Sequence, residues 1–171
     1  AVAIRPHLVW GPGDTQLIGR IVERAASGRL VLIDGGAALV DTTYIDNAAD
    51  ALVAALDRVE SVTGEAFVVS NAEPRTVAEL LTRICRAAGA PEPRRSVPRV
   101  VASGAGTVVE RVWSASSSTG EPPMTRFLAE QLSTAHWFDQ RRTQERLQWT
   151  PAVSLAEGFE RLAASYTPHN E

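Results

Sequence analysis

A rigid loop follows the first apolar run of the sequence and separates it from a helical pattern. Residues 1–4 predict a short buried strand, which must end near Pro6 because proline has no N–H to donate to a neighbouring strand. The Gly-Pro-Gly run at residues 11–13 interrupts regular structure, and Asp14 can cap a following helix. Open α/β sheets bind ligands where a strand ends in a loop before a helix, so residues 5–14 predict a binding site of unspecified chemistry.

Strand and helix patterns alternate over residues 1–90, which is typical of the α/β class. β-favouring apolar runs predict strands at residues 30–33, 39–45 and 66–69. Apolar residues at helical spacing predict helices that begin near residues 17, 46 and 77. Thr76 and Glu79 form a capping box for the last of these helices, and Gly89 ends it.

The second predicted helix carries a stripe of apolar side chains, and Asp46 is expected to be its N-cap. The stripe consists of Ala48, Ala51, Leu52, Ala55 and Leu56. This spacing places all five on one face, so we expect that face to be buried. The small alanines would let it pack closely against a sheet or another helix.

Residues 91–171 are predicted to be mainly helical, after a Pro- and Arg-rich connector at 91–98. Helices are expected at 100–113, 125–132 and 139–147, a loop at 114–123, and a last helix from a capping box at Ser154. No other boundary is stronger than the connector. The 171 residues therefore predict one domain, with an α/β part at 1–90 and a mainly helical part at 91–171.

Composition excludes several classes of partner. The net charge of −3 gives no basic surface for nucleic acid, and no apolar run approaches the about 20 residues of a membrane span. The single cysteine, Cys85, falls on an apolar helical stripe and is compatible with the reducing cytoplasm, where we expect the protein. His7, His136 and His169 lie far apart in the sequence, so no metal site is expected.

All 17 basic residues are arginine, so a mechanism that needs a lysine amine cannot be completed by this chain. We accordingly assign no catalytic residue to it. The chain begins inside the predicted strand at 1–4, which needs neighbours, so we expect it to be a segment of a longer protein. The exposed edge of that strand predicts that the isolated chain self-associates.

Six segments resemble, in the same order, motifs of the extended short-chain dehydrogenases/reductases, in the NAD-dependent epimerase/dehydratase superfamily. Residues 5–14 (RPHLVWGPGD) resemble the RPxxVYGPGD motif, and residues 40–51 (VDTTYIDNAADA) resemble the DFxYVDNxAxA motif. The remaining matches are residues 64–67 (GEAF), 138–139 (FD), 149–151 (WTP) and 154–158 (SLAEG). Together they span nearly the whole chain.

The resemblance is to the C-terminal, substrate-binding half of that family. It implies part of an NAD(P)-binding Rossmann-type α/β fold, with short parallel strands and a mainly helical substrate domain. In the family, the N-terminal half supplies the glycine-rich dinucleotide loop and the catalytic Ser/Thr, Tyr and Lys, which agrees with the lack of lysine here. NAD or NADP would then be bound mainly by a half that these residues do not include.

Two positions distinguish branches of the family. Sugar-nucleotide epimerases and dehydratases usually have Asn where this chain has Leu8, and have Arg, to hold a diphosphate, where it has Val40. The pairs Val40–Asp41 and Asp46–Asn47 and residues 122–127 (PPMTRF) are more similar to the 3β-hydroxysteroid dehydrogenase/isomerase branch. That branch acts on apolar secondary alcohols or ketones, including sterols.

The resemblance implies roles for five residues. Pro6 and His7 would lie beside the nicotinamide, and Leu8, Trp10 and Trp113 would line the substrate side. The leading hypothesis is the substrate-binding half of an NAD(P)-dependent oxidoreductase that acts on an apolar small molecule. A fragment of a nucleotide-sugar epimerase or dehydratase, and a non-catalytic binding module of the same fold, stay open as alternatives.

Overall fold

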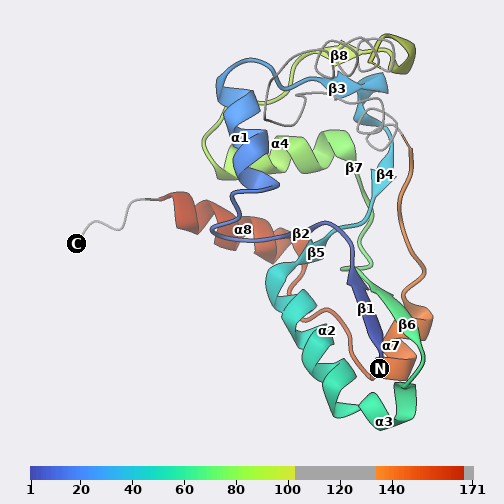
Figure 1. Cartoon of the computed structure of the whole chain (residues 1–171). Coiled ribbons are helices and arrows are strands. Elements are labelled where there is room, and N and C mark those ends of the chain that lie inside the picture. The colour runs from blue at the N-terminus through green and yellow to red at the C-terminus, as the bar shows by residue number, and fades with distance from the viewer. Residues whose placement is uncertain (103–133, 168–171) are drawn as a thin grey trace, which may run out of the picture.

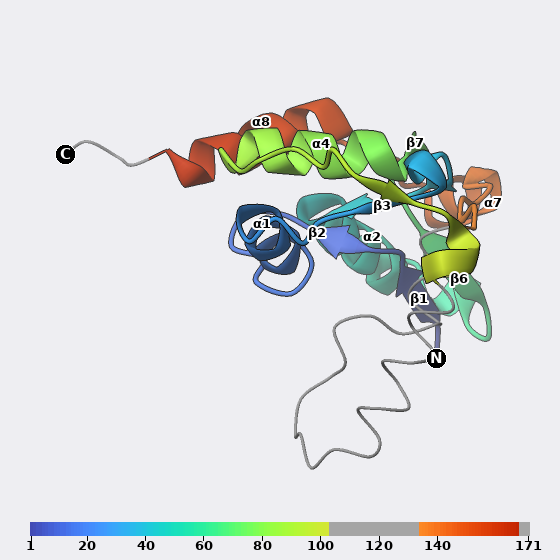
Figure 2. The same cartoon turned by 90° about the horizontal axis from the view of Figure 1, so that it is seen from above.

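The computed structural model describes residues 1–102 and 134–167, whose arrangement Figures 1 and 2 show. The predicted loop at 114–123 and helix at 125–132 lie outside the described residues, as do Trp113 and most of the predicted helix at 100–113.

The strands of the described residues are short and associate in pairs, most of them parallel. The longest pair joins β1 (Ala3–Pro6) to β6 (Ala66–Val69) in parallel, with Pro6 opposite Val69. The other pairs are β2 (Val9–Trp10) with β5 (Thr43–Tyr44) and β3 (Leu32–Ile33) with β8 (Ser96–Val97), both parallel, and β4 (Leu39–Val40) with β7 (Arg75–Thr76), antiparallel. This confirms the predicted α/β class, although the single strand expected at 39–45 is two shorter ones, β4 and β5.

The helices fall into two groups around these strands (Figure 1). The first group contains α1 (Ile18–Ala26), α4 (Val77–Ala87) and α8 (Leu155–Tyr166), and Figure 2 shows α4 and α8 side by side. The second contains α2 (Ile45–Asp57), α3 (Val59–Val62) and α7 (Arg141–Leu147), near β1 and β6; a short 3-10 helix, η1 (Asp34–Gly36), follows β3. In the described part of the chain, no helix has both the length and the apolar character that crossing a membrane requires.

Thr76 and Ser154 are the N-caps of α4 and α8, as predicted, whereas the N-cap of α1 is Leu17 and not Asp14, which lies in the turn before it. The Asp14 carboxylate accepts hydrogen bonds from the backbone N–H groups of residues 16–18, at 2.7 to 3.3 Å. Thr76 Oγ1 accepts from the Glu79 N–H at 3.1 Å, and Ser154 Oγ accepts from the Glu157 N–H at 3.2 Å. Each bond satisfies an N–H that a helix start would otherwise leave without a partner.

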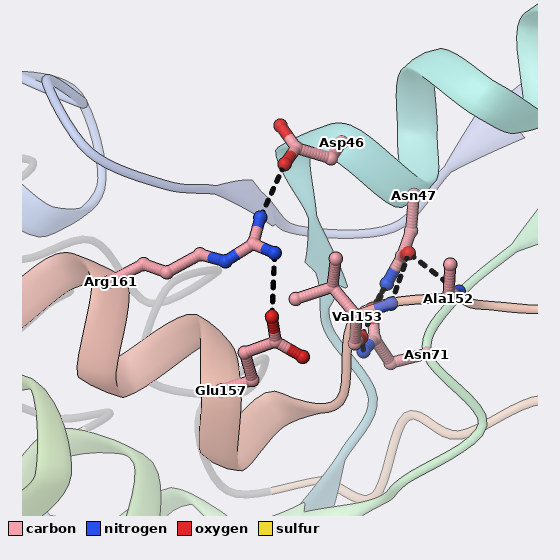
Figure 3. Close-up of polar contacts among 7 residues, drawn as sticks. All are labelled: Asp46, Asn47, Asn71, Ala152, Val153, Glu157 and Arg161. Atoms are coloured by element: carbon pink, nitrogen blue, oxygen red, sulfur yellow. Dashed lines mark hydrogen bonds and ion pairs between the residues drawn. The ribbon is translucent and has the colours of Figure 1, made fainter.

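Two expectations for α2 are wrong. Asp46 does not cap the helix, because the helix begins at Ile45; Asp46 lies in the first turn, and its carboxylate accepts from Arg161 Nη1 at 2.8 Å (Figure 3). Leu52 and Leu56 are 52% and 69% exposed, whereas the alanines of the predicted stripe are buried. The helix turns its small residues inward because they allow the close packing that leucine would prevent.

A fully bonded amide ties α2 to the segment before α8 (Figure 3). The Asn47 side chain donates to Asn71 Oδ1 at 3.0 Å and to the Val153 carbonyl at 2.7 Å. Its oxygen accepts from the backbone N–H groups of Ala152 and Val153, both at 3.0 Å. All four hydrogen-bonding positions of this buried amide are therefore used.

The core consists of two main clusters. One surrounds Trp10 and Tyr44 and includes the inner faces of α4 and α8. The other lies between α2, β6 and α7 and is centred on Phe67 and Trp149. Cys85 is completely buried in α4, and burial raises the pKa of its thiol, which makes it an inert packing residue.

Candidate functional site

An apolar pocket of about 350 Å³ lies beside the loop that follows β1. This volume is within the range of small-molecule sites, about 300 to 1,000 Å³. The loop, β2, α1, the segment after α1 and α4 all contribute to its wall. Its apolar side chains are Leu8, Trp10, Leu17, Ile21, Leu30, Val31, Ile33, Val40, Val77, Leu80, Leu81 and Ile84.

The loop that carries Pro6 and His7 is fixed by hydrogen bonds to two neighbouring strands. Pro6 ends β1, and the next residue donates its N–H to the Val69 carbonyl at 3.0 Å. The His7 carbonyl accepts from Thr43 Oγ1 at 2.7 Å. Pro6 ends the strand without contributing to the pocket wall, whereas His7 lines the pocket. Their predicted contact with the nicotinamide stays a prediction.

Leu8 lines the pocket in a left-handed backbone conformation, with φ +43°. Its side chain is 38% exposed, and its carbonyl accepts from the Thr43 N–H at 3.2 Å. This conformation costs an ordinary L-residue about 1 to 2 kcal/mol. Backbone strain of this kind is concentrated at ligand sites, so its occurrence here supports the site predicted from residues 5–14.

Trp10 forms a rigid wall of the pocket. It is almost fully buried, and its indole N–H donates to Thr42 Oγ1 at 3.0 Å. Its ring stacks on Phe159 with the ring centres 4.7 Å apart, and the edge of Tyr44 packs against it at 5.5 Å. The indole thus joins the pocket to the core, and its contact with a substrate stays a prediction. Trp113 lies outside the described residues, so its predicted role is untested.

A polar cluster that the sequence did not predict lies at the His7 end of the pocket. His136 lines the pocket too, and its ring faces that of His7 at 6.3 Å between centres, with 21° between the planes. Asp41 is completely buried, and its Oδ2 accepts from the Phe138 N–H at 3.1 Å. These residues come together because the chain around residue 136 pairs with Val40, a contact between positions too distant for any spacing pattern to reveal.

Burial is the main influence on His7. It lowers the pKa of the imidazole from its ordinary value, because a charged ring loses water there. His136 lowers this pKa further, whereas the carboxylate of Asp41 raises it. Burial therefore favours a neutral His7 at neutral pH.

The α1 side of the pocket is positively charged. Arg20, Arg24 and Arg29 contribute to its wall. Arg29 donates from Nε to Ser27 Oγ at 2.9 Å and lies 3.7 Å from the Glu23 carboxylate. Arg20 and Arg24 also have interaction partners of their own. The wall of the pocket is thus mainly apolar and includes three arginines.

The sequence model of the 3-beta hydroxysteroid dehydrogenase/isomerase family matches residues 1–99. The chain belongs to this family. The match confirms the predicted resemblance to this branch of the extended short-chain dehydrogenases/reductases.

Curated relatives with reductase and dehydrogenase names align along nearly the whole chain. A 2-alkyl-3-oxoalkanoate reductase from Stenotrophomonas maltophilia is 44% identical over 167 residues, which cover 96% of this chain and 51% of the relative. A protein of the same name from Shewanella oneidensis is 41% identical over 168 residues, 96% of this chain and 43% of the relative. The human sterol-4-alpha-carboxylate 3-dehydrogenase, decarboxylating, is 28% identical over 170 residues, which cover 96% of this chain and 46% of the relative. The chain spans about half the length of these relatives.

Solved structures share the fold at lower identity. UDP-glucuronic acid 4-epimerase from Bacillus cereus, solved with NAD, superposes with a TM-score of 0.60 at 19% identity and covers 97% of this chain and 45% of its own. The epimerase Mth375 from Methanothermobacter thermautotrophicus gives a TM-score of 0.63 at 20% identity, with coverage of 96% and 42%. At these identities the likeness establishes the Rossmann-type fold alone.

Proposed function

We propose that this chain is the substrate-binding part of an NAD(P)-dependent oxidoreductase that interconverts a ketone and a secondary alcohol on an apolar substrate. The observation that carries the proposal is the apolar pocket beside the strained loop at Leu8. Its volume suits a small apolar molecule, and its wall is held rigid by Trp10.

The wall of the pocket favours this substrate class over a nucleotide sugar. Val40 lies in the wall and is 5% exposed, at the position where the resemblance places a diphosphate-binding arginine in sugar-nucleotide enzymes. Valine offers no hydrogen bond to a phosphate, and Leu8 likewise presents an apolar side chain. A ligand that buries alkyl carbon in this pocket gains about 0.8 kcal/mol for each methylene group.

Within this class we propose a long-chain 3-oxo acid rather than a sterol. The support comes from the two 2-alkyl-3-oxoalkanoate reductases, which share 44% and 41% identity with the chain, against 28% for the human sterol enzyme. A 2-alkyl-3-oxo acid carries two alkyl chains on a short polar head. Such a molecule suits a pocket whose wall is mainly apolar and includes three arginines.

A nicotinamide dinucleotide would supply the hydride for this reaction. The loop at Pro6 and His7 fits a place beside it, because the loop is held at both ends by backbone bonds and opens onto the pocket. The dinucleotide itself would be bound mainly by residues outside this chain. We also propose a cytoplasmic location, which the free, buried Cys85 supports.

The test is a substrate panel on the full-length protein. NADH or NADPH oxidation is the readout for the ketones, and chromatographic separation of the sugar nucleotides is the readout for the UDP-sugar. The panel contains a 2-alkyl-3-oxo acid, a 3-keto steroid and a UDP-sugar. We expect turnover of the oxo acid, weaker turnover of the steroid and none of the UDP-sugar. Conversion of the UDP-sugar without turnover of either ketone would contradict the proposal and favour the epimerase alternative.

A further inference from the structure

Two buried polar atoms near the His7 end of the pocket have no hydrogen-bond partner among residues 1–102 and 134–167. They are Oδ1 of Asp41 and Nε2 of His7. Asp41 is completely buried, and its only side-chain bond in the described residues is the one that Oδ2 accepts from the Phe138 N–H. A carboxylate removed from water is costly unless a cation or several donors face it. These two atoms therefore leave hydrogen-bonding capacity that a ligand could use.

The His7 ring is held in place between aromatic neighbours. The Phe138 ring packs against it edge-on, with 5.0 Å between the centres, and the His136 ring lies nearly parallel to it. Nδ1 of His136 is bonded to the Thr134 carbonyl at 2.8 Å. The His7 ring is thus positioned by packing, at the end of the pocket where β1 enters the loop.

A charged imidazole would complete this arrangement when a second anion binds. The ring then carries N–H groups on both nitrogens, so it can donate to an anionic ligand while the buried Asp41 carboxylate stabilises its charge electrostatically. Asp41 favours the charged ring, whereas burial and His136 oppose it. The arginines of α1 line the same pocket. An anionic ligand beside His7 would therefore tip the balance toward protonation.

We propose that His7, backed by the buried Asp41, binds the carboxylate of the substrate, with Asp41 as a positioning residue. This assignment rests on the proposed function, because it takes the substrate to be a 3-oxo acid. In such an acid the carboxylate is only two bonds from the keto carbon. The keto carbon must lie beside the nicotinamide, at the Pro6–His7 loop, so the carboxylate must lie at the same end.

The arginines of the pocket wall, Arg20 and Arg24 in α1 and Arg29 after it, are the alternative binding group for a carboxylate. All three already have interaction partners within the protein. His7 and Asp41, in contrast, each carry a buried atom with none. A carboxylate therefore satisfies more unmet bonding capacity at His7 than at α1, and the alkyl chains remain free to occupy the apolar length of the pocket.

The test compares an acid with its uncharged ester, by calorimetric titration of the full-length protein. The probes are 3-hydroxydodecanoate and its methyl ester, which share one chain and one hydroxyl group. Because the carboxylate stabilises protonated His7, the acid should bind about tenfold more tightly at about pH 6 than at about pH 8, while the affinity for the ester stays constant.

Substituted variants distinguish a His7 that binds the carboxylate from a His7 that only lines the pocket wall. His7→Gln should lower the affinity for the acid about tenfold at about pH 6 and leave the ester unchanged. Asp41→Asn should move the pH dependence of acid binding to lower pH, because the imidazolium loses its buried partner. Asp50→Asn, at an exposed position of α2 outside the pocket wall, is the control and should change neither. If His7→Gln fails to fold, the imidazole resonances of His7 in the unaltered protein give the same information: the acid should raise the pKa of His7, and the ester should not.

The outcomes are distinct. Equal binding of acid and ester, or equal weakening of both by His7→Gln, overturns the carboxylate site and leaves the proposed function standing. Loss of the acid preference in Arg29→Gln but not in His7→Gln also overturns it. Failure of both probes to bind overturns the apolar substrate class itself, and this assignment with it.

Discussion

Leu8 combines an unfavourable backbone with an exposed apolar side chain. Its φ of +43° is a conformation that asparagine and glycine adopt at lower cost. A leucine there reduces stability, and the property it gains is an apolar surface in the wall of the pocket. Leucine at this position therefore lowers the stability of the fold and adds apolar surface to the pocket.

Leu8→Asn should raise the free energy of unfolding by about 1 kcal/mol and weaken binding of apolar ligands. Urea unfolding and ligand titration of the full-length protein measure the two effects. Leu8→Ala is the control: it keeps the strained conformation, so it should weaken binding without raising stability. A Leu8→Asn variant that is less stable than the parent would contradict this explanation of the strain.

His7 should make the folded protein less stable in mild acid. Its pKa is lowered by burial, so the unfolded chain takes up a proton at about pH 6.5, before the folded chain does. The free energy of unfolding should therefore fall as the pH drops through about 6.5, and His7→Gln should flatten this dependence. Urea midpoints between about pH 8 and about pH 5.5 measure it, in a window above the acidic groups with unfolded values near 4. If the free energy of unfolding of His7→Gln depended on pH as steeply as that of the parent, His7 would be excluded as the cause.

The contact of α8 with the pocket wall depends on a glycine. A Cβ at Gly158 would lie 2.8 Å from Cδ2 of Tyr44 and 3.1 Å from Cη2 of Trp10. Both rings are fixed, Trp10 by its bond to Thr42 and by stacking on Phe159. The helix can approach the rings only because this side chain is absent.

Gly158→Ala should lower the free energy of unfolding by about 1 to 3 kcal/mol, because the rings must move. Gly19→Ala in α1 is the matched control, since its Cβ would meet its nearest neighbour at 3.5 Å. It should raise stability by about 0.5 to 1 kcal/mol through helix propensity. Thermal or urea unfolding of both variants measures these changes. A higher free energy of unfolding in both variants would show that α8 has room for a side chain at Gly158.

Local sequence signals predicted where helices begin, but they did not predict which faces of the helices are buried. Thr76 and Ser154 cap helices as expected, because a cap needs only its own neighbours, whereas Asp14 lies one turn before α1, whose N-cap is Leu17. The buried face of α2 was mispredicted, because hydrophobicity counts leucine above alanine whereas close packing selects alanine. Asn47 was noticed only as part of a motif, since its bonds reach residues more than a hundred positions away.

The same difference applies to the candidate site. His7, Leu8 and Trp10 lie within four residues of one another in the sequence, and all three line the pocket, while their roles stay predictions. His136 and the role of Asp41 were not found. They join the site through pairing between distant segments, which leaves no periodicity or spacing in the sequence.

At the scale of the molecule, the edge of β1 suggests how the isolated chain behaves. In the described residues β1 pairs with β6 alone, and the neighbouring α2 exposes Leu52, Val53 and Leu56. An unpaired strand edge beside apolar surface recruits another strand. We therefore predict that the isolated 171-residue chain self-associates, with a mass that rises with concentration in light scattering. A constant monomer mass at high concentration would contradict this.

The central claim is that the pocket selects substrates by their apolar length. It is tested most directly by kcat/KM of the full-length protein for 3-oxo acids of increasing chain length, with the lysine-free isolated chain as an inactive control. Each buried methylene is worth about 0.8 kcal/mol, so kcat/KM should rise about fourfold per methylene until the pocket is filled, and then level off. A kcat/KM that does not change with chain length would contradict the account.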